Sequence, residues 1–490
     1  MLTTKVYFTD LIGNDYKLWD HKKIILNGGT GCGKTHFTIN TLIPYYIDQN
    51  KTVLYLCNRT NLYKQLEKKL RKTSVKLMTY QSLQKSLRRG TFTKQYDLII
   101  ADECHYFYID AKFNGYTDLS YSYVMEQSES TVVFLSATAD GMFSDMLTDG
   151  LVEDKNVYTI PKVYDYVEKV YTYKKDELTD IIDEILADNE FEKILIFVNS
   201  MQRLIEMHDY YGDSADYMCS DSQRCKFANR DCIADNKFPK RLLFTTKVLD
   251  NGVDLKDDDL RHIFCELFDI DSALQSIGRK RSLDYFDTCD FYFRIYDARA
   301  INNFYMSNHK QLTPVHSFLE DEESYLHYLD TQNIDTRSIA RKNKIFFIDM
   351  HTKTLKINNC ALKKYEYDKR TIEKMKESDY ETVLFEHLGD DLKSKKSELK
   401  ISVQQKDVFQ YILEDLEGKK LFKQEQDELK ERFRDVLGLH DRTMGINTLN
   451  GKLKDCNYKY EIVSEREYTR KSENYKKRYW MIKPLPPGAV

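Results

Sequence analysis

No stretch of the 490-residue sequence is apolar over the roughly 20 residues that a membrane-spanning helix requires. The N-terminal segment also lacks the apolar core of a secretory signal. We therefore expect a soluble, cytoplasmic protein with no membrane partner. Its ten cysteines should be reduced thiols, because disulfides are rare in that compartment. Cys219, Cys225 and Cys232 follow His208, but no CxxC pair occurs among them, which does not favour a zinc site.

An excess of positive charge is absent as well. The sequence has 74 Lys and Arg against 78 Asp and Glu, a net charge of −4, which excludes attraction of nucleic acid by overall charge. Any such binding must depend on a local basic groove. Proline is scarce, with 7 residues, whereas Lys, Tyr, Asn and Ile are abundant, which indicates an AT-rich coding genome. The length exceeds one hydrophobic core and predicts about three domains.

A glycine-rich loop follows the first predicted strand, the apolar run Lys23–Asn27. Residues 28–35 read Gly-Gly-Thr-Gly-Cys-Gly-Lys-Thr and match the GxxxxGK[ST] pattern. In such loops backbone N–H groups hold the α- and β-phosphates, the lysine reaches the β/γ oxygens, and the hydroxyl binds Mg²⁺. The predicted nucleotide-binding residues are Gly28, Thr30, Gly31, Gly33, Lys34 and Thr35, the last also a metal ligand.

An acidic pair follows a second buried run. Residues 96–101 have the composition of a fully buried parallel strand, and Asp102-Glu103-Cys104-His105 comes next. The carboxyl end of such a strand faces the ligand crevice of an α/β sheet, so Asp102 can serve Mg²⁺ and Glu103 the attacking water. An Asp-Glu pair alone is commonly a solvated surface feature. After a phosphate-binding loop, we predict that both residues are catalytic, together with Lys34.

A third buried run, Thr131–Leu135, leads into Ser136-Ala137-Thr138. The loop, the Asp-Glu-Cys-His box and Ser-Ala-Thr occur in the order found in superfamily 2 helicases of the DEAD/DEAH type, which the sequence resembles. The resemblance implies an α/β fold with two tandem RecA-like P-loop domains, each with a parallel sheet, and ATP hydrolysed between them. It also implies that Ser136 and Thr138 couple the nucleotide state to nucleic acid.

Further buried runs predict the strands of a second domain, at residues 193–200, 241–246 and 262–265. By the resemblance, Thr246 contacts a nucleic-acid phosphate, and residues 250–254 form a fifth motif in which Gly252 and Asp254 face the nucleotide. Residues 275–281 resemble the sixth motif, whose cations act as arginine fingers on the γ-phosphate. The catalytic residues implied there are Gln275, Arg279 and Arg281.

Two departures from the family pattern matter. The family usually places a second arginine three positions after the first, but position 282 is Ser282 and Arg281 comes one residue early, so we rank Arg279 first. Residues 1–27 contain no glutamine, which several helicase groups use to recognise adenine, and this argues against a DEAD-box RNA helicase. The segment 246–254 resembles DNA translocases of the repair and phage type. DNA is therefore preferred over RNA.

Two segments of the first domain, residues 56–60 and 79–82, resemble strand-gripping motifs of the family. The resemblance implies phosphate contacts from Arg59, Thr60, Thr79 and Ser82. Such contacts hold the backbone and carry no sequence information. For Thr60 and Ser82, capping of a helix start is an open alternative.

Beyond residue 296 the helicase motifs end. The hydropathy pattern predicts a small hairpin from residues 345–349 and 354–357, a charged helix at 368–388 and a solvated linker at 389–400. This part would connect the motor to a C-terminal module.

The last residues, 405–490, show three amphipathic helices followed by two strand-like runs, which is the order of a winged helix. The expected apolar faces consist of Val408, Ile412 and Leu416, then Leu429, Phe433, Val436 and Leu437, and then Ile446, Leu449 and Leu453. Residues 451–490 hold ten Lys and Arg against five Asp and Glu. We predict DNA contacts from Lys452 and Lys454 on the third helix, with a protein-docking module as the alternative.

The expected domains are two RecA-like domains at 1–165 and 166–300, a connector at 301–404 and a winged-helix-like module at 405–490. The predicted function is an ATP-dependent helicase or translocase with ATP and Mg²⁺ as cofactors, acting on DNA in a replication or repair assembly. The alternatives are an ATP-switched origin-binding or replication-initiation factor and an RNA helicase.

Overall fold

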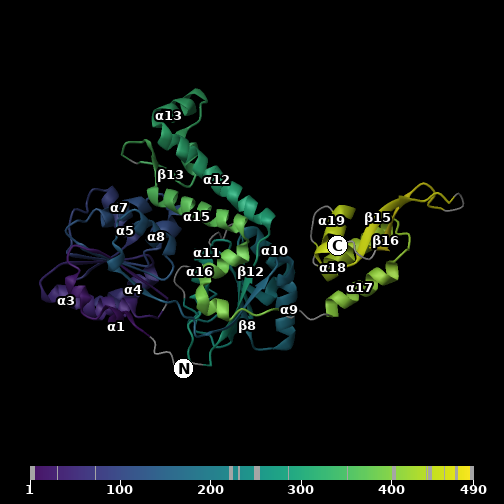
Figure 1. Cartoon of the computed structure of the whole chain (residues 1–490), viewed down its shortest axis with the longest axis horizontal. Helices are drawn as coiled ribbons and strands as arrows, with labels where there is room; N and C mark the ends of the chain where they lie inside the picture. The colour runs from purple at the N-terminus through teal and green to yellow at the C-terminus, as the bar shows by residue number, and fades with distance from the viewer. Residues whose placement is uncertain are drawn as a thin grey trace. The chain divides into compact units, whose positions relative to one another are not determined.

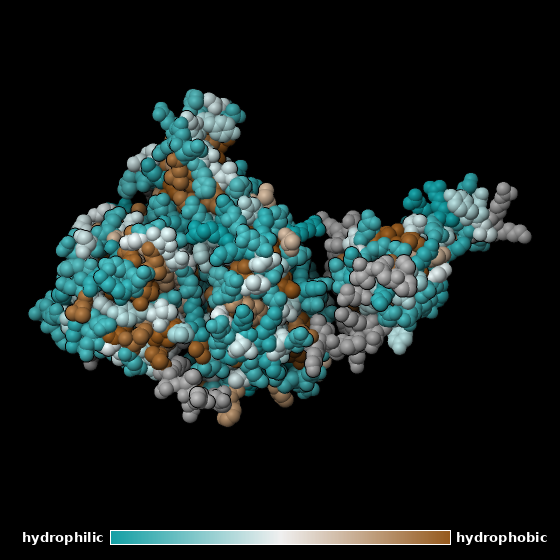
Figure 2. All heavy atoms as spheres, in the orientation of Figure 1, coloured by the Kyte–Doolittle hydropathy of each residue, from teal (hydrophilic) through white to brown (hydrophobic). Residues whose placement is uncertain are grey.

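The computed structural model describes residues 6–29, 31–71, 73–219, 225–229, 232–247, 254–284, 286–349, 351–399, 404–437, 439, 444–456, 458–469 and 473–485. The chain forms two compact units. The first consists of residues 1–172 and 191–397, and the second of residues 173–190 and 398–490. Figure 2 shows that hydrophilic residues cover most of the visible face, with apolar residues in small groups.

Six strands form the first sheet of the larger unit, in the order β3-β2-β4-β5-β1-β6, and all five pairings are parallel. Its strands are β1 (Lys23–Gly28), β2 (Val53–Cys57), β3 (Lys76–Thr79), β4 (Leu98–Asp102), β5 (Thr131–Ser136) and β6 (Val157–Ile160). The inner strands are continuous apolar runs because helices cover both faces of the sheet (Figure 1).

Two hydrophobic cores lie on the two faces of this sheet. One contains Phe8, Phe37 and Leu66, from α1, α2 and α4. The other contains Leu83 of α5 and also Phe318 of the connector. The helices are α1 (Phe8–Ile12), α2 (Lys34–Phe37), α3 (Ile43–Asp48), α4 (Thr60–Leu70), α5 (Tyr80–Arg88), α6 (Tyr106–Ile109), α7 (Thr117–Met125) and α8 (Asp140–Thr148).

The second sheet repeats this architecture, with strand order β7-β12-β11-β8-β10-β9. Its strands are β7 (Val167–Tyr173), β8 (Lys193–Phe197), β9 (Ala215–Met218), β10 (Leu242–Thr245), β11 (Leu260–Cys265) and β12 (Cys289–Arg294). The pairings of β8 to β12 are parallel. The helices of this part of the larger unit are α10 (Met201–Tyr211) and α11 (Ile270–Ile277). α9 (Leu178–Asp188), which lies between β7 and β8 in the sequence, belongs to the smaller unit. Two parallel six-stranded sheets in succession are the expected tandem RecA-like fold.

The connector is a helical layer with a small hairpin. It comprises α12 (Ala298–Glu320), α13 (Glu322–Thr331), α14 (Thr336–Lys342), β13 (Phe346–Ile348), β14 (Leu355–Ile357), α15 (Asn359–Glu377) and α16 (Tyr380–Ser394). The hairpin strands pair antiparallel. α15 packs along α12 and also against α6 and α7 of the first sheet (Figure 1).

The sequence prediction for residues 368–400 is wrong in two respects. Two helices replace the single charged helix, because Asp379 caps a new one by accepting a hydrogen bond from the Thr382 N–H. The backbone kinks at Gly389, where the linker was expected to begin, but α16 then resumes and runs to Ser394. Beyond it, Lys396 forms an isolated bridge to Val170 of β7. The reason is burial, since the Leu392 side chain is fully buried in the core of the second sheet.

The smaller unit contains the C-terminal module, with α17 (Gln404–Leu416), α18 (Lys423–Leu437), α19 (Ile446–Asp455), β15 (Tyr460–Arg466) and β16 (Arg478–Pro484). β15 and β16 form an antiparallel hairpin, and Glu417 and Leu421 make isolated bridges to β16. On the first helix, Phe409 and Leu413 are the buried residues. The expected Ile412 and Leu416 are half-buried and pack against the same core, in which the Phe409 ring lies edge-on to Phe433. The Val408 side chain lies outside the described residues.

No helix in the described parts of the chain combines the length and apolar character needed to cross a membrane.

Candidate functional site

The glycine-rich loop joins β1 to a continuous helical stretch that runs from Lys34 to Asp48. Gly31 and Gly33 have φ angles of 80° and 85°, which other residues adopt only with strain. A Cβ atom on Gly28 would lie 2.9 Å from the Phe8 ring. Thr30 lies outside the described residues. The loop geometry therefore requires glycine at these positions, and the loop ends at a helix N-terminus, where N–H groups attract anions.

The Lys34 amine lies against this loop. It donates hydrogen bonds to the backbone oxygens of Gly28 and Gly29, the second at 2.8 Å. Thr35 follows in the first helical turn and is half-buried. A cation, a hydroxyl and a left-handed glycine loop form a donor set that suits a triphosphate with Mg²⁺.

Asp102 lies at the carboxyl end of β4, in the middle of the first sheet, and is 4% exposed. Its Oδ2 accepts a 2.6 Å hydrogen bond from the Tyr55 hydroxyl, and its Oδ1 accepts one from the Glu103 N–H at 3.0 Å. Burial, and then the negative charge of Glu103, raise the pKa of Asp102 to about 7. A buried carboxylate of this kind is stabilised by a cation, which fits a metal ligand. Tyr55 was not identified from the sequence, because a tyrosine in a strand is ordinarily a core residue.

Glu103 has a left-handed backbone with a φ of 51°, which is uncommon for a residue with a side chain. Its Oε2 lies 3.3 Å from Nδ1 of His105, and 41% of its side chain is exposed. Burial opposes its ionisation, but the hydrogen bond and charge of His105 and then the charges of Lys34 and Arg279 lower its pKa to about 2. Glu103 is therefore an ionised carboxylate, stabilised by the charge of Lys34 from the first sheet and of Arg279 from the second.

A chain of polar contacts runs from the acidic box to the second sheet. His105 Nδ1 lies 3.1 Å from the Ser136 hydroxyl and 3.4 Å from the Thr138 hydroxyl. The Gln275 amide, on α11, donates to that Thr138 hydroxyl at 3.2 Å. All four side chains are buried. The structure thus brings Ser136 and Thr138 together with Gln275, which lies more than 130 positions further along the chain.

The three cations that follow α11 have different surroundings. Arg279 donates from Nε to the backbone oxygen of Gln275 at 3.2 Å and acts electrostatically on Glu103. Lys280 is fully buried and pairs with Asp287 at 2.5 Å. Arg281 pairs with Asp254 at 3.0 Å, so two residues expected at the nucleotide contact each other. Gly252 lies outside the described residues.

The residues expected to grip nucleic acid in the first domain have protein partners. Arg59 lies 3.4 Å from Asp110. The Thr79 hydroxyl accepts a hydrogen bond from the Ser82 N–H and donates to the Ser82 hydroxyl at 2.9 Å, which is an N-cap of α5. For Ser82 this matches the helix-start alternative. The side chain of Thr60 lies outside the described residues, and Thr246, after β10, is half-buried.

The two lysines expected to contact DNA from α19 point in different directions. Lys454 is exposed, whereas Lys452 is 8% exposed and forms an ion pair with Asp176. Lys452 therefore has a partner within the protein, and its contact with DNA stays a prediction. Lys452 precedes the buried Leu453 on the inner face of the helix, so its amine meets an acidic partner within the same unit.

A buried charge network beside the site was not foreseen from the sequence. The Lys364 amine on α15 lies 2.7 Å from both Asp271 and Asp368, and 3.5 Å from Asp269. Lys112, which follows α6, lies 2.6 Å from Asp368 and 3.3 Å from Asp269. Burial opposes the charge on Lys364, but the three aspartates raise its pKa well above the usual range. Only the Lys364/Asp368 spacing on one helix was visible in the sequence.

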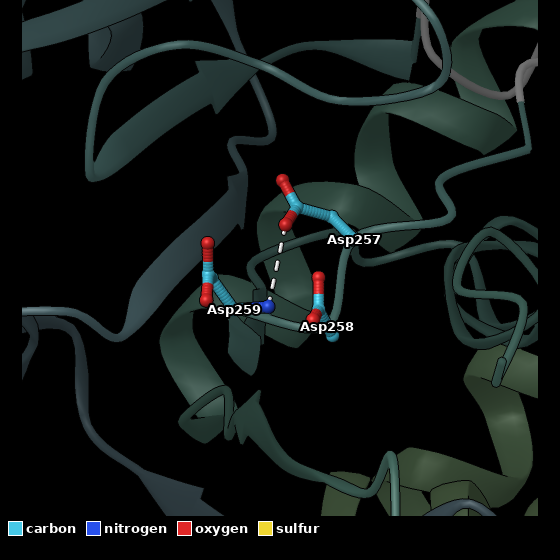
Figure 3. Close-up of side chains that lie close together, drawn as sticks. All are labelled: Asp257, Asp258 and Asp259. Carbon is cyan, nitrogen blue, oxygen red and sulfur yellow. Dashed lines mark hydrogen bonds between the residues drawn. The ribbon is translucent and has the colours of Figure 1, made fainter. Parts of the chain in front are cut away.

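A group of three carboxylates, Asp257, Asp258 and Asp259, lies in the turn before β11 (Figure 3). The Asp259 N–H donates to Asp257 at 3.3 Å. Lysines already neutralise the group, because Lys193 lies 2.9 Å from Asp257 and Lys237 lies 2.8 Å from Asp258. These carboxylates therefore form part of a salt-bridged turn.

Two RecA-like sheets, one with the glycine loop and acidic pair and the other with an arginine whose charge acts on Glu103, define a P-loop ATPase with tandem domains. Residues 12–76 and 67–141 match the family described as "Type III restriction enzyme, res subunit". Residues 174–281 match "Helicase conserved C-terminal domain". Together these matches identify the chain as a superfamily 2 helicase, an enzyme that hydrolyses ATP.

Two similar solved structures are those of S. cerevisiae Dbp5 and a single-residue variant of it, both bound to RNA and ADP BeF3. They are 15% and 14% identical, cover 58% and 57% of this chain and 81% of their own chains, and have a TM-score of 0.42. No curated protein matches the chain by sequence.

Proposed function

We propose that this helicase is a DNA translocase or unwinding enzyme in which ATP hydrolysis depends on contact between the two sheets. The observation that carries the proposal is the path from Glu103 through His105 and Thr138 to Gln275, because it joins the acidic box to the helix that precedes Arg279. A change on either side of this path alters the other. Such a link is what a motor needs in order to couple chemistry to strand movement.

We assign the residue roles as follows. Lys34 and the loop N–H groups would hold the triphosphate, while Thr35 and Asp102 would hold Mg²⁺. The metal would supply positive charge that offsets the negative charge of the phosphates. Glu103, ionised by its surroundings, accepts a hydrogen bond from the attacking water and orients it. Arg279 stabilises the negative charge that develops on the transferred phosphoryl group.

Two arguments support DNA over RNA. The segment 246–254 resembles DNA translocases, and the first domain matches a family whose description names a restriction enzyme, a class that cuts DNA. RNA remains the alternative, because contacts with phosphates alone do not distinguish the two nucleic acids. We further propose that residues 405–490 form a winged-helix-like module. Its exposed basic residues Lys454, Arg466, Lys476 and Lys477 would contact DNA.

An ATPase activator panel tests the proposal. Single-stranded DNA, duplex DNA and RNA are compared at equal nucleotide concentration, with Lys34→Ala as the blank, and the strongest stimulation is expected with DNA. Strand separation is then measured with a tailed duplex. A preference for RNA would favour the RNA-helicase alternative. Slow turnover that no nucleic acid stimulates, without strand separation, would favour an ATP-switched initiation factor.

A further inference from the structure

A strongly basic segment of the first domain overlaps and extends well beyond the two strand-gripping motifs. Residues 59–94 contain eleven Lys and Arg and a single acidic residue, Glu67, in a chain whose net charge is −4. The segment covers α4, β3 and α5 (Figure 1). This local excess of positively charged side chains gives this part of the surface a positive potential that the whole chain lacks.

Most of these cations face solvent. The exposed ones among the described residues are Lys64, Lys68, Lys69, Arg71, Lys76, Lys85, Arg89 and Lys94. None of these eight has a carboxylate partner among the ion pairs of the described residues, in contrast to Arg59, which pairs with Asp110. Cations in the last turn of a helix also stabilise its dipole. That effect accounts for one or two residues on each helix and not for eight.

The cations are arranged around the edge of the sheet. β3 is the outermost strand, with β2 as its one neighbour. The apolar residues of α4, such as Leu66, belong to the core on one face of the sheet, and those of α5, such as Leu83, belong to the core on the other face. The outer surfaces of the two helices therefore present positive charge on both sides of the β3 edge, with Lys76 of β3 between them.

We propose that this edge, formed by α4, β3 and α5, binds the phosphate backbones of a nucleic-acid duplex adjacent to the strand held by the motor. The arrangement favours a duplex over an extended single strand, because cations on two helices separated by a sheet edge match a ligand that carries two backbones. Contacts of lysine and arginine with phosphates need no base recognition, which suits an enzyme that moves along any sequence. The inference rests on the proposed function, since it names a further part of the same substrate.

The test is the salt dependence of duplex binding by the full chain. The α4 variant carries Lys68→Gln and Lys69→Gln on α4 and Arg71→Gln just after it. The α5 variant carries Lys85→Gln on α5 and Arg89→Gln just after it, and a third variant combines all five substitutions. A matched control replaces three exposed lysines of the connector, with Lys310→Gln, Lys353→Gln and Lys374→Gln. Binding of a blunt fluorescent duplex is measured by anisotropy at several salt concentrations, after thermal unfolding shows that each variant is folded.

We expect the plot of log affinity against log salt to become shallower by about 0.9 for each phosphate of B-form DNA that the variant no longer neutralises. The α4 and α5 variants should each show part of the effect, the combined variant the whole of it, and the control none. The proposal would be overturned if the combined variant had the same slope of log affinity against log salt as the parent protein. An equally shallow slope in the control would overturn it as well, because it would mean that the duplex responds to total charge.

This outcome is distinct from that of the ATPase panel. Failure of single-stranded DNA to stimulate the parent enzyme would count against the motor, whatever the salt slopes. A normal stimulation with unchanged slopes would leave the motor in place and remove only the duplex surface.

Discussion

Glu103 is the residue on which the proposed chemistry depends most directly. Its left-handed backbone turns the carboxylate toward His105, and the surrounding cations keep it ionised. An ionised carboxylate can hold a water molecule by accepting its hydrogen bond. A neutral amide of the same shape cannot accept a proton from that water.

We therefore expect Glu103→Gln to retain ATP binding and to lower the rate of ATP hydrolysis by about 10²- to 10⁴-fold, the range for removal of a general base. The measurement is steady-state hydrolysis with saturating DNA, together with binding of a fluorescent ATP analogue. Lys34→Ala is the contrasting variant, since it should lose the nucleotide itself. Near-normal hydrolysis by Glu103→Gln would contradict its role.

The two arginines after α11 allow a matched comparison. Arg279 acts on Glu103, whereas Arg281 is held by Asp254. Arg279→Gln should lower the single-turnover rate of hydrolysis by about 10³-fold or more, as loss of an arginine finger does. Arg281→Gln should lower it much less. Equal decreases would show that Arg281 leaves Asp254 and reaches the phosphate.

At the scale of elements, α15 connects two parts of the motor that lie next to different helicase motifs. Through Lys364 it binds the start of α11, and through Asp368 it binds Lys112 near α6. Removal of one partner from a buried ion pair leaves an uncompensated charge. The helix therefore contributes to the stability of the region where the two sheets meet.

Lys364→Met should lower the free energy of unfolding by about 3–5 kcal/mol, measured by urea unfolding, since it leaves the buried Asp271 without its cation. The neighbouring Lys363→Met is the control, because Lys363 forms a partly exposed pair with Asp149. Exposed pairs contribute about 0–1 kcal/mol. The two variants should differ clearly, and similar unfolding midpoints would mean that the buried network stabilises little.

A substitution at Thr79, the N-cap of α5, can distinguish a capping role from a phosphate contact. Aspartate caps a helix about as well as threonine, so Thr79→Asp should change the stability by about 0.5 kcal/mol or less. Its negative charge would repel a nearby phosphate, and single-stranded DNA binding should weaken. Fluorescence anisotropy and thermal unfolding measure the two effects. Unchanged DNA binding in the folded variant would leave Thr79 with the cap alone.

At the scale of the whole molecule, the motor and the C-terminal module belong to separate compact units. The module has its own core, which includes Phe409, Leu429, Phe433, Leu449 and Ile462. Since none of the proposed catalytic residues lies in it, the module should affect substrate binding more than hydrolysis.

Deletion of residues 405–490 should therefore leave ATP hydrolysis in the absence of DNA within about twofold of the parent rate and weaken DNA binding. The checks are basal turnover and anisotropy with a tailed duplex. If the shortened protein loses both activities and unfolds at lower temperature, the module is a structural part of the motor.

The amino-acid sequence alone determined the order of the motifs and the buried strands, because both are local. Lys23–Asn27, residues 96–101 and Thr131–Leu135 are continuous apolar runs, and such runs are buried whatever lies elsewhere in the chain. Local charge misled at residues 389–400, where Leu392 is drawn into the core of the second sheet despite its charged neighbours. It also gave no sign that Lys452 pairs with Asp176, which lies more than 270 positions away.

Only the tertiary structure decided which polar side chains meet. The pairing of Arg281 with Asp254, the contact of Gln275 with Thr138 and the buried network around Lys364 all depend on where each backbone places its side chains. Hydrophobic burial is non-directional and can be read from composition along the chain. Hydrogen bonds and buried ion pairs need specific distances and angles between residues remote in sequence, so they are fixed only when the sheets and helices pack.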